Sequence, residues 1–225
     1  MVSENKTLLN KMEFINGFQL KMIALITMTI DHIGSICFPT NIFLRQIGRM
    51  ALPIYIFLLV EGITHTKNIN KYLLRLIVLA LISEIPFDYA FFKSFYYLGY
   101  QNIFFTLSLG LIAVCAIQKY QNKFLQFVLI GLISYFAEII KSDYGYWGVL
   151  FVVVAYYLRK NKIVKQIPYI VFNVFLYGGV QSYGALSVIP IFAYNGKRGY
   201  PLKYFFYIYY PIHLIMIRFI FDIVC

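Results

Sequence analysis

Charged residues are scarce in this chain. They make up 13% of its 225 residues, whereas an average soluble domain has about 25%. Hydrophobic residues account for 61% and aromatic residues for 20%, and the mean hydropathy is +0.72. So few charges cannot cover a surface in contact with water. The composition therefore excludes a soluble domain and predicts an integral membrane protein whose outer surface is covered by lipid.

Acidic residues and cysteines are rarer still. Nine Asp and Glu stand against twenty Lys and Arg, which gives a formal net charge of +11. Basic chains often bind nucleic acid, but the placement of these residues, described below, indicates anionic lipid and membrane topology, so no nucleic-acid partner is expected. Cys37, Cys115 and Cys225 are far apart. Their spacing matches neither a metal site nor a disulfide framework and predicts three buried free thiols.

Hydrophobic runs repeat along the whole chain and predict an all-α, polytopic transmembrane bundle of about nine helices. The runs cover residues 19–38, 46–64, 72–92, 102–118, 124–140, 145–158, 167–178, 183–194 and 203–224. The sixth to eighth are shorter than the ~20 residues of a full span, so eight or ten helices also fit. The predicted organisation is a cytoplasmic tail, residues 1–18, and a single transmembrane domain, residues 19–225. The first run lacks a small-residue cleavage site, so no cleavable signal peptide is expected.

The basic residues are distributed unevenly between the two sides of this bundle. Thirteen of the twenty fall in the tail and the even-numbered loops. Three fall on the opposite side, namely Arg45, Lys93 and Lys141, and four lie within spans, namely Lys21, Arg49, Arg75 and Arg218. Cytoplasmic loops carry an excess of Lys and Arg. The chain is therefore predicted to be a multi-pass protein of the cytoplasmic membrane, with its N-terminus inside and its C-terminus outside.

Ionisable residues also lie in or beside the predicted spans. They include seven of the nine acidic residues and all three histidines, namely Asp31, Glu61, Glu84, Asp88, Glu138, Asp143, Asp222, His32, His65 and His213. Each charged group near the bilayer centre costs about 2.5–3.5 kcal/mol or more. A chain that only anchors itself in lipid has no use for so many, so these side chains are predicted to face one another across a polar interior.

Depth divides these groups into two zones. Counted from the cytoplasmic end of each helix, His32, Arg49 and Glu84 lie roughly 18–21 Å deep at ~1.5 Å per residue. Glu138 and Arg218 lie at a similar level, and His213 is slightly shallower at about 14 Å. A second zone lies toward the cytoplasmic edge and contains Lys21, Glu61, His65, Lys71 and Arg75. The deeper zone suits proton chemistry, and the mostly cationic inner zone suits an anion such as a phosphate.

Several short sequence motifs resemble those of the TraX family, and they occur in the same order as in that family over nearly the whole chain. They are KMIALITMTIDHIG (21–34), IGRMALPIYIFLLVEGITHTKN (47–68), KYLLRLIVLALISEIPFDYAF (71–91), QNIFFTLSLG (101–110), DYGYWGVL (143–150), YNGKRG (194–199) and YIYYPIHL (207–214). The founding function of this family is N-terminal acetylation of conjugative pilin. Its members are distantly similar to membrane acyltransferases of the acyltransferase-3 type, which carry a basic residue, ten positions and a histidine on the first core helix. Lys21 and His32 have that spacing.

The resemblance implies an acyltransferase that uses acetyl-CoA as co-substrate. The phosphates of acetyl-CoA would be bound by Lys21, Lys71 and Arg75, with Glu61 and His65 near the CoA arm. The acceptor would be a pilin-like or other small peptide N-terminus, or a glycan hydroxyl. Neither the oligomeric state nor the involvement of a conjugation system follows from these residues.

His32 is the expected general base, deprotonating the acceptor amine or hydroxyl. Asp31 or Glu84 would orient its imidazole, since neighbours on a helix point about 100° apart and Asp31 is not automatically the partner. Arg49 would stabilise the oxyanion or pair with Glu84, and a ping-pong route through acetyl-His32 also fits. The same residues have structural readings. His32 can be a buried hydrogen-bonding histidine, and Arg49 with Glu84 can be an ion pair of the scaffold.

Two other function classes remain open at this point. Intramembrane Asp, Glu and His also form proton relays, so a small proton-coupled secondary transporter or lipid flippase is the alternative. The short sixth to eighth runs would then be discontinuous helices, although no inverted repeat is evident. A non-catalytic membrane assembly factor is the third reading, and it would tolerate the loss of His32.

Overall fold

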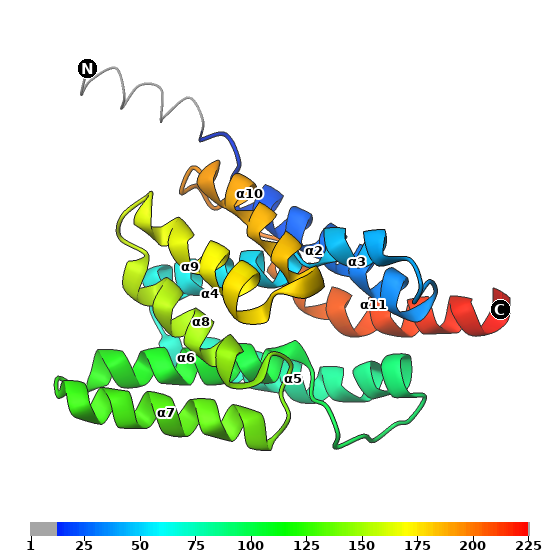
Figure 1. The fold of residues 1–225 in the computed structure, drawn as a ribbon, viewed down its shortest axis with the longest axis horizontal. Coiled ribbons are helices and arrows are strands. Elements are labelled where there is room, and N and C mark those ends of the chain that lie inside the picture. The colour runs from blue at the N-terminus through cyan, green and yellow to red at the C-terminus, as the bar shows by residue number, and fades with distance from the viewer. Residues whose placement is uncertain (1–12, 225) are drawn as a thin grey trace. The chain divides into compact units, whose positions relative to one another are not determined.

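The computed structural model describes residues 13–224, and its regular elements are all helical (Figure 1). Within this range no strand forms, and two isolated bridges pair Ile15 with Tyr194 and Gln101 with Ser142. The all-α prediction is confirmed. The contacts divide the chain into two compact units, residues 13–58 with 160–203 and residues 59–159 with 204–224. Residues 1–12 of the expected tail lie outside the described range, and the boundary at residue 18 stays a prediction.

The first unit joins the N-terminal helices to an irregular helical segment. Its elements are α2 (Gly17–Ile36), α3 (Ile42–Gly48), the first half of α4 (Ala51–His65), η1 (Val164–Gln166), α9 (Ile167–Ile170), η2 (Val171–Tyr177), η3 (Gly179–Ser187) and α10 (Val188–Phe192). η2 is a π-helix and η3 is a 3-10 helix, where the sequence predicted two short ordinary helices. α3 forms largely in the segment that the sequence predicted to be a loop after residue 38.

Two glycines let α3 lie directly on α2. A Cβ atom at Gly34 would lie 2.7 Å from Cβ of Leu44 on α3, and one at Gly48 would lie 2.6 Å from Cα of Asp31. Real Cβ atoms do not approach other heavy atoms so closely, so any larger residue at either position would push the two helices apart. The glycines therefore set the spacing at which α3 side chains meet Asp31.

Gly48→Ala is expected to destabilise the protein by about 1–3 kcal/mol, the usual cost of forcing an extra methyl group into a packed contact. Gly131→Ala on α7 is the matched control. Nothing lies within 4 Å of a Cβ built there, and alanine is favoured over glycine in a helix interior by about 0.5–1 kcal/mol. Thermal unfolding of the purified protein in detergent measures both variants. Equal midpoints for Gly48→Ala and the wild type would contradict the close contact.

The second unit is built from longer helices. It contains the end of α4, α5 (Ile69–Phe92), α6 (Ile103–Lys119), α7 (Lys123–Ile139), α8 (Gly145–Leu158) and α11 (Lys203–Val224). α6 packs against α5, α7 and α8, and α6 and α7 run side by side in Figure 1. A Cβ atom at Gly110 of α6 would lie 2.7 Å from Val152 of α8. Small residues at such contacts let helix backbones approach closely, as is common between membrane helices.

Asparagine begins most of the longer helices. The caps are Asn16 of α2, Asn41 of α3, Asn68 of α5, Asn102 of α6 and Asn122 of α7. In each case the side-chain oxygen accepts a hydrogen bond from a backbone N–H group in the first turn, which would otherwise lack a partner. At α2, Gln19 also bonds back to the N–H group of Asn16. These caps fix the observed starts of the helices, which lie within a few residues of the starts of the hydrophobic runs.

Two helical segments among residues 13–224 are long and apolar enough to cross a membrane, judged by length and composition alone. They are Ile42–His65 and Tyr204–Ile223. Three further apolar helices in this range, at 103–119, 145–158 and 179–192, are shorter. The 14 residues of α8 extend only about 21 Å, whereas a bilayer core is about 30 Å thick. The crossing of a membrane by about nine helices therefore stays a prediction.

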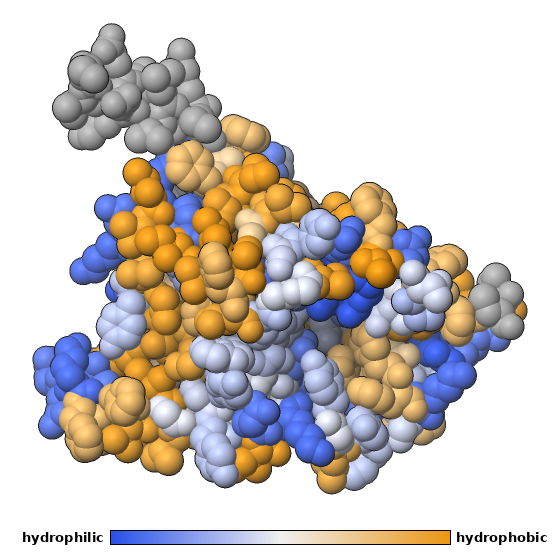
Figure 2. Space-filling view, in the orientation of Figure 1, coloured by the Kyte–Doolittle hydropathy of each residue, from blue (hydrophilic) through white to orange (hydrophobic). Residues whose placement is uncertain are grey.

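Large hydrophobic side chains are exposed on several helices. On α7 they are Phe124, Leu125, Phe127, Leu132, Tyr135, Phe136 and Ile139, and on α11 they include Ile208, Ile212, Ile215, Met216, Phe219, Ile220 and Ile223. Figure 2 shows hydrophobic residues over much of the face that it presents. Soluble monomers rarely expose contiguous apolar patches of more than a few hundred Å².

Candidate functional site

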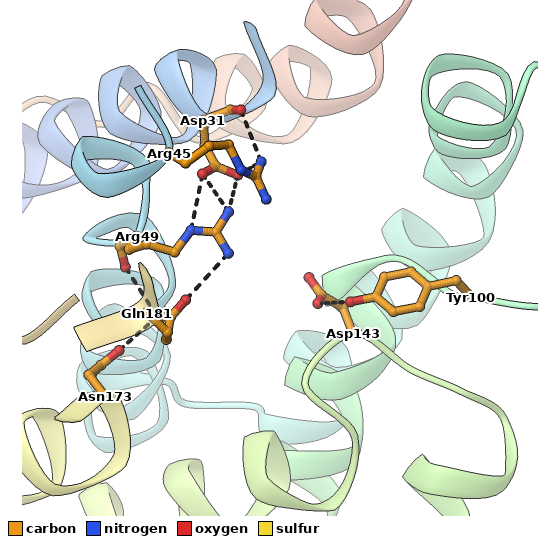
Figure 3. Close-up of polar contacts among 7 residues, drawn as sticks. All are labelled: Asp31, Arg45, Arg49, Tyr100, Asp143, Asn173 and Gln181. Carbon is orange, nitrogen blue, oxygen red and sulfur yellow. Dashed lines mark hydrogen bonds and ion pairs between the residues drawn. The ribbon is translucent and has the colours of Figure 1, made fainter. Parts of the chain in front are cut away.

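A carboxylate held by two arginines lies in the first unit (Figure 3). Asp31, on α2, is buried, and its residue exposure is 8%. Nη1 of Arg45 donates to Oδ2 of Asp31 at 2.8 Å and to the Asp31 carbonyl oxygen at 3.1 Å. Nε of Arg49 donates to Oδ1 at 3.1 Å, and Nη2 of Arg49 contacts both carboxylate oxygens. We call these three residues the Asp31 cluster.

The local fold explains how the two guanidinium groups converge. Arg45 lies on α3 and Arg49 is the C-cap of that helix, so the two are four residues apart and on one face. The close approach at Gly48 then brings this face onto Asp31. Arginine is charged at all accessible pH values, so the Asp31 cluster has a formal charge of +1. The hydrophobic runs predict that Arg45 lies in a loop outside the spans, and they give no indication of its contact with Asp31.

A hydrogen-bonded pair of amides continues from the Asp31 cluster. Nη1 of Arg49 donates to Oε1 of Gln181 at 3.4 Å, and Nε2 of Gln181 donates to Oδ1 of Asn173 at 2.7 Å. Neither amide was predicted as a site residue. Asn173 lies within a predicted apolar run and Gln181 between two of them, and a single amide at such a place is a weak signal because buried amides commonly satisfy backbone groups.

His32 and Lys21, the two residues of the acyltransferase spacing, both lie on α2 and are half-buried. His32 directly follows Asp31, whose two carboxylate oxygens are bonded to Arg45 and Arg49. Lys21 lies near the start of the helix, close enough to Arg198 for that charge to act on it. The N–H group of Gly17 donates to the carbonyl oxygen of Lys197 at 2.7 Å. The segment NGKRG is therefore anchored at the end of α2 where Lys21 lies.

Glu84 and Asp88, in the second unit, both hold the connection between α5 and α6. Oε2 of Glu84 accepts from the N–H group of Asn102 at 3.3 Å and from its Nδ2 atom. Oδ2 of Asp88 accepts from the N–H group of Tyr97 at 2.7 Å. These bonds favour the scaffold reading for both carboxylates, and the catalytic role expected of Glu84 stays a prediction.

The remaining predicted cofactor-binding residues also lie in the second unit. Nδ1 of His65 lies 3.9 Å from Oε2 of Glu61 and 2.9 Å from the carbonyl oxygen of Glu61, which confirms their common helix face. His65 and Lys71 are exposed, whereas Arg75 is half-buried, with its guanidinium carbon 5.7 Å from the ring centre of Tyr72. Their binding of acetyl-CoA stays a prediction.

Two ionisable residues of α11 have local partners. His213 is buried, and its Nδ1 atom lies 2.9 Å from the carbonyl oxygen of Tyr209. Arg218 is also buried and donates from Nη2 to Oδ1 of Asp222, four residues later, at 2.6 Å. Both interactions stay within α11, which continues through Pro211. Each of these two side chains thus has its partner one turn away on its own helix.

Comparison with known proteins agrees with the resemblance to the TraX family that the sequence motifs indicate. The sequence model of the family described as TraX protein matches residues 16–221. The probable fimbrial assembly protein FimC, serogroup H1, of Dichelobacter nodosus is 29% identical over 233 residues, which cover 90% of this chain and 94% of that protein. An uncharacterized protein of Rickettsia prowazekii (strain Madrid E) is 27% identical over 150 residues, 64% of this chain and 56% of that protein. No solved structure matches. Because the family match spans most of the chain, this protein belongs to the TraX family.

Proposed function

We propose that this protein is a membrane-embedded acetyltransferase that transfers the acetyl group of acetyl-CoA to the N-terminal amine of a pilin-like peptide. Membership of the TraX family carries the proposal, because pilin N-acetylation is the founding function of that family. The relative from Dichelobacter nodosus is named for fimbrial assembly, which supports a pilin-like acceptor. Another small peptide or a glycan hydroxyl would use the same chemistry.

The proposed location is the cytoplasmic membrane, with several helices crossing it. The exposed apolar side chains of α7 and α11 support contact with lipid, and the excess of basic residues in the tail and even-numbered loops supports a cytoplasmic N-terminus and an outer C-terminus. Irregular helix such as η2 and η3 is tolerated at membrane depth where protein surrounds it or where it lines a cavity.

The proposed reaction begins with proton transfer from the acceptor ammonium group to His32. The freed amine attacks the thioester carbonyl carbon of acetyl-CoA, forming a C–N bond and a tetrahedral oxyanion. Loss of a further proton from nitrogen and cleavage of the C–S bond give the amide and the CoA thiol, which takes up one proton. Arg49 lies at the end of α3, the helix that packs on the helix carrying His32, and its positive charge stabilises the oxyanion.

The phosphates of acetyl-CoA require cations on the cytoplasmic side. In the first unit, Lys21 and Arg198 lie within electrostatic range of each other, and an anion between such groups would relieve their repulsion. Lys71 and Arg75 are expected from the family resemblance to bind phosphate, and Glu61 and His65 to contact the CoA arm; for these four residues of the second unit that stays a prediction. The donor set is suited to phosphate, because Arg and Lys are its usual partners in proteins.

A proton-coupled transporter or lipid flippase is the second candidate. It is favoured by the change from the π-helix η2 to the 3-10 helix η3, which occurs at Gly178 and Gly179 with φ values of 64° and 53°. Discontinuous helices of this kind form the substrate sites of many secondary transporters.

Mass spectrometry of intact pilin-like proteins from cells with and without this chain separates the two candidates. The acetyltransferase proposal predicts that one protein gains the mass of a single acetyl group at its N-terminus only when the chain is present. Purified protein should also bind acetyl-CoA, and Lys21→Ala should weaken that binding. If no peptide or glycan is acetylated and acetyl-CoA does not bind, the transporter reading replaces the enzyme.

A further inference from the structure

Gln181 contacts Arg49 at two points. Its Oε1 atom accepts from Nη1 of Arg49 at 3.4 Å, and its Nε2 atom donates to the backbone carbonyl oxygen of Arg49, also at 3.4 Å (Figure 3). The amide of Gln181 thus hydrogen-bonds to both the side chain and the main chain of Arg49, which is 132 positions earlier in the sequence. Such a pair of bonds fixes the direction in which the guanidinium group leaves the end of α3.

Asn173 fixes Gln181 in turn. Its Oδ1 atom accepts from Nε2 of Gln181 at 2.7 Å, and its own Nδ2 atom donates to the carbonyl oxygen of Tyr169 at 2.6 Å. Asn173 is 0% exposed and Gln181 is 8% exposed. Because buried amides are costly unless hydrogen-bonded, these bonds determine the orientation of both side chains.

The irregular backbone of this segment brings the two amides together. Asn173 lies in the π-helix η2 and Gln181 in the 3-10 helix η3, which follows the break at Gly178 and Gly179. A Cβ atom at Gly184 would collide with Oδ1 of Asn173 and lie 2.9 Å from Nε2 of Gln181. A regular helix through this range would place residues eight apart about 12 Å from each other along its axis, too far for their amides to bond.

We infer that Gln181 and Asn173 are positioning residues, which orient the Arg49 guanidinium group for the reaction. The inference rests on the proposed function and adds to it a reason for the π-helix, an element often found at functional sites. Asp31 supplies the opposite charge, and Gln181 supplies a neutral bond at a different nitrogen of the guanidinium group. Between them, the carboxylate and the amide leave Arg49 one orientation, while its charge is unchanged.

The test compares acetyl transfer by the full-length protein, in membranes or detergent, between wild type, Gln181→Leu and Gln181→Glu. Gln181→Leu removes both bonds to Arg49, so kcat should fall by about 10-fold to 100-fold, since a displacement of 1 Å in a reacting group can cost about 100-fold. KM for acetyl-CoA should change little, because Gln181 is not among the residues proposed to bind it. Gln181→Glu keeps an acceptor for Nη1 of Arg49 and should retain more of the rate than Gln181→Leu.

Val180→Ala, at the neighbouring exposed position, is the matched control and should behave as wild type. If Gln181→Leu does not fold, Gln181→Glu and Asn173→Asp decide the matter. Gln181→Glu keeps the acceptor for Nη1 of Arg49 but cannot donate to Asn173, whereas Asn173→Asp keeps the acceptor for Gln181 but cannot donate to Tyr169. Wild-type rates in Gln181→Leu, or a change in KM for acetyl-CoA alone, would overturn the inference and leave the proposed function intact. A wild-type protein that transfers no acetyl group would overturn both.

Discussion

Replacing His32 with alanine is expected to reduce the rate of acetyl transfer by about 10²-fold to 10⁴-fold, the usual contribution of a general base. The expectation rests on three facts. His32 lies on α2 next to the anchored Asp31, it is half-buried, and it stands at the spacing from Lys21 that resembles membrane acyltransferases. The measurement is transfer of radiolabelled acetyl from acetyl-CoA to a pilin-like peptide, at saturating concentrations of both.

Ile26→Ala serves as the control for His32→Ala. Ile26 lies on the same helix and is 51% exposed, so its truncation shortens a side chain of α2 that is not part of the proposed site. Binding of acetyl-CoA should survive in both variants, because the phosphates are assigned to other residues. Undiminished transfer by His32→Ala would exclude it as the base. A fimbrial phenotype that persists without any acetylation would point instead to a non-catalytic assembly factor.

The hydrophobic runs predicted the positions of the helices well because two simple signals coincide. The helices are rich in apolar side chains along their length, and asparagine caps such as Asn68 and Asn102 mark where they begin. The failures lie where backbone geometry departs from the regular helix. Periodicity cannot distinguish a π-helix or 3-10 helix from an α-helix over short apolar runs, so residues 171–178 and 183–187 were predicted as parts of two ordinary helices.

The sequence indicated which residues are chemically unusual but not which of them meet. Depth along each helix placed Arg49 and Glu84 at one level but did not indicate that Arg49 bonds to Asp31 and Gln181, or that Glu84 bonds to Asn102. Rotation about each helix axis decides such pairings, and it depends on close contacts such as the one at Gly48. Arg45 was missed because α3 was expected to be a loop.

The Asp31 cluster also bears on stability, and Asp31→Ala is expected to lower the free energy of unfolding by about 3–5 kcal/mol. The side chain of Asp31 is 11% exposed, and those of Arg49 and Arg45 are 17% and 29% exposed. Removing the carboxylate leaves two guanidinium groups facing each other in a poorly solvated place. The loss of stability combines the repulsion between the two guanidinium groups with the cost of burying their charges without the carboxylate that neutralised one of them.

A charge-balanced variant distinguishes this explanation from simple loss of packing. Asp31→Ala combined with Arg49→Leu removes one charge of each sign, so it should recover part of the stability lost by Asp31→Ala alone, measured as the midpoint of thermal unfolding in detergent. Glu13→Ala is the control. Glu13 pairs with Lys162 at 2.6 Å, and removing it leaves one lysine and no second cation facing it, so its loss should cost about 0–1 kcal/mol. If the double variant is less stable than Asp31→Ala, Arg49 stabilises the fold through contacts other than the carboxylate. The guanidinium would then be part of the packed scaffold, and its proposed role at the oxyanion would lose its structural basis.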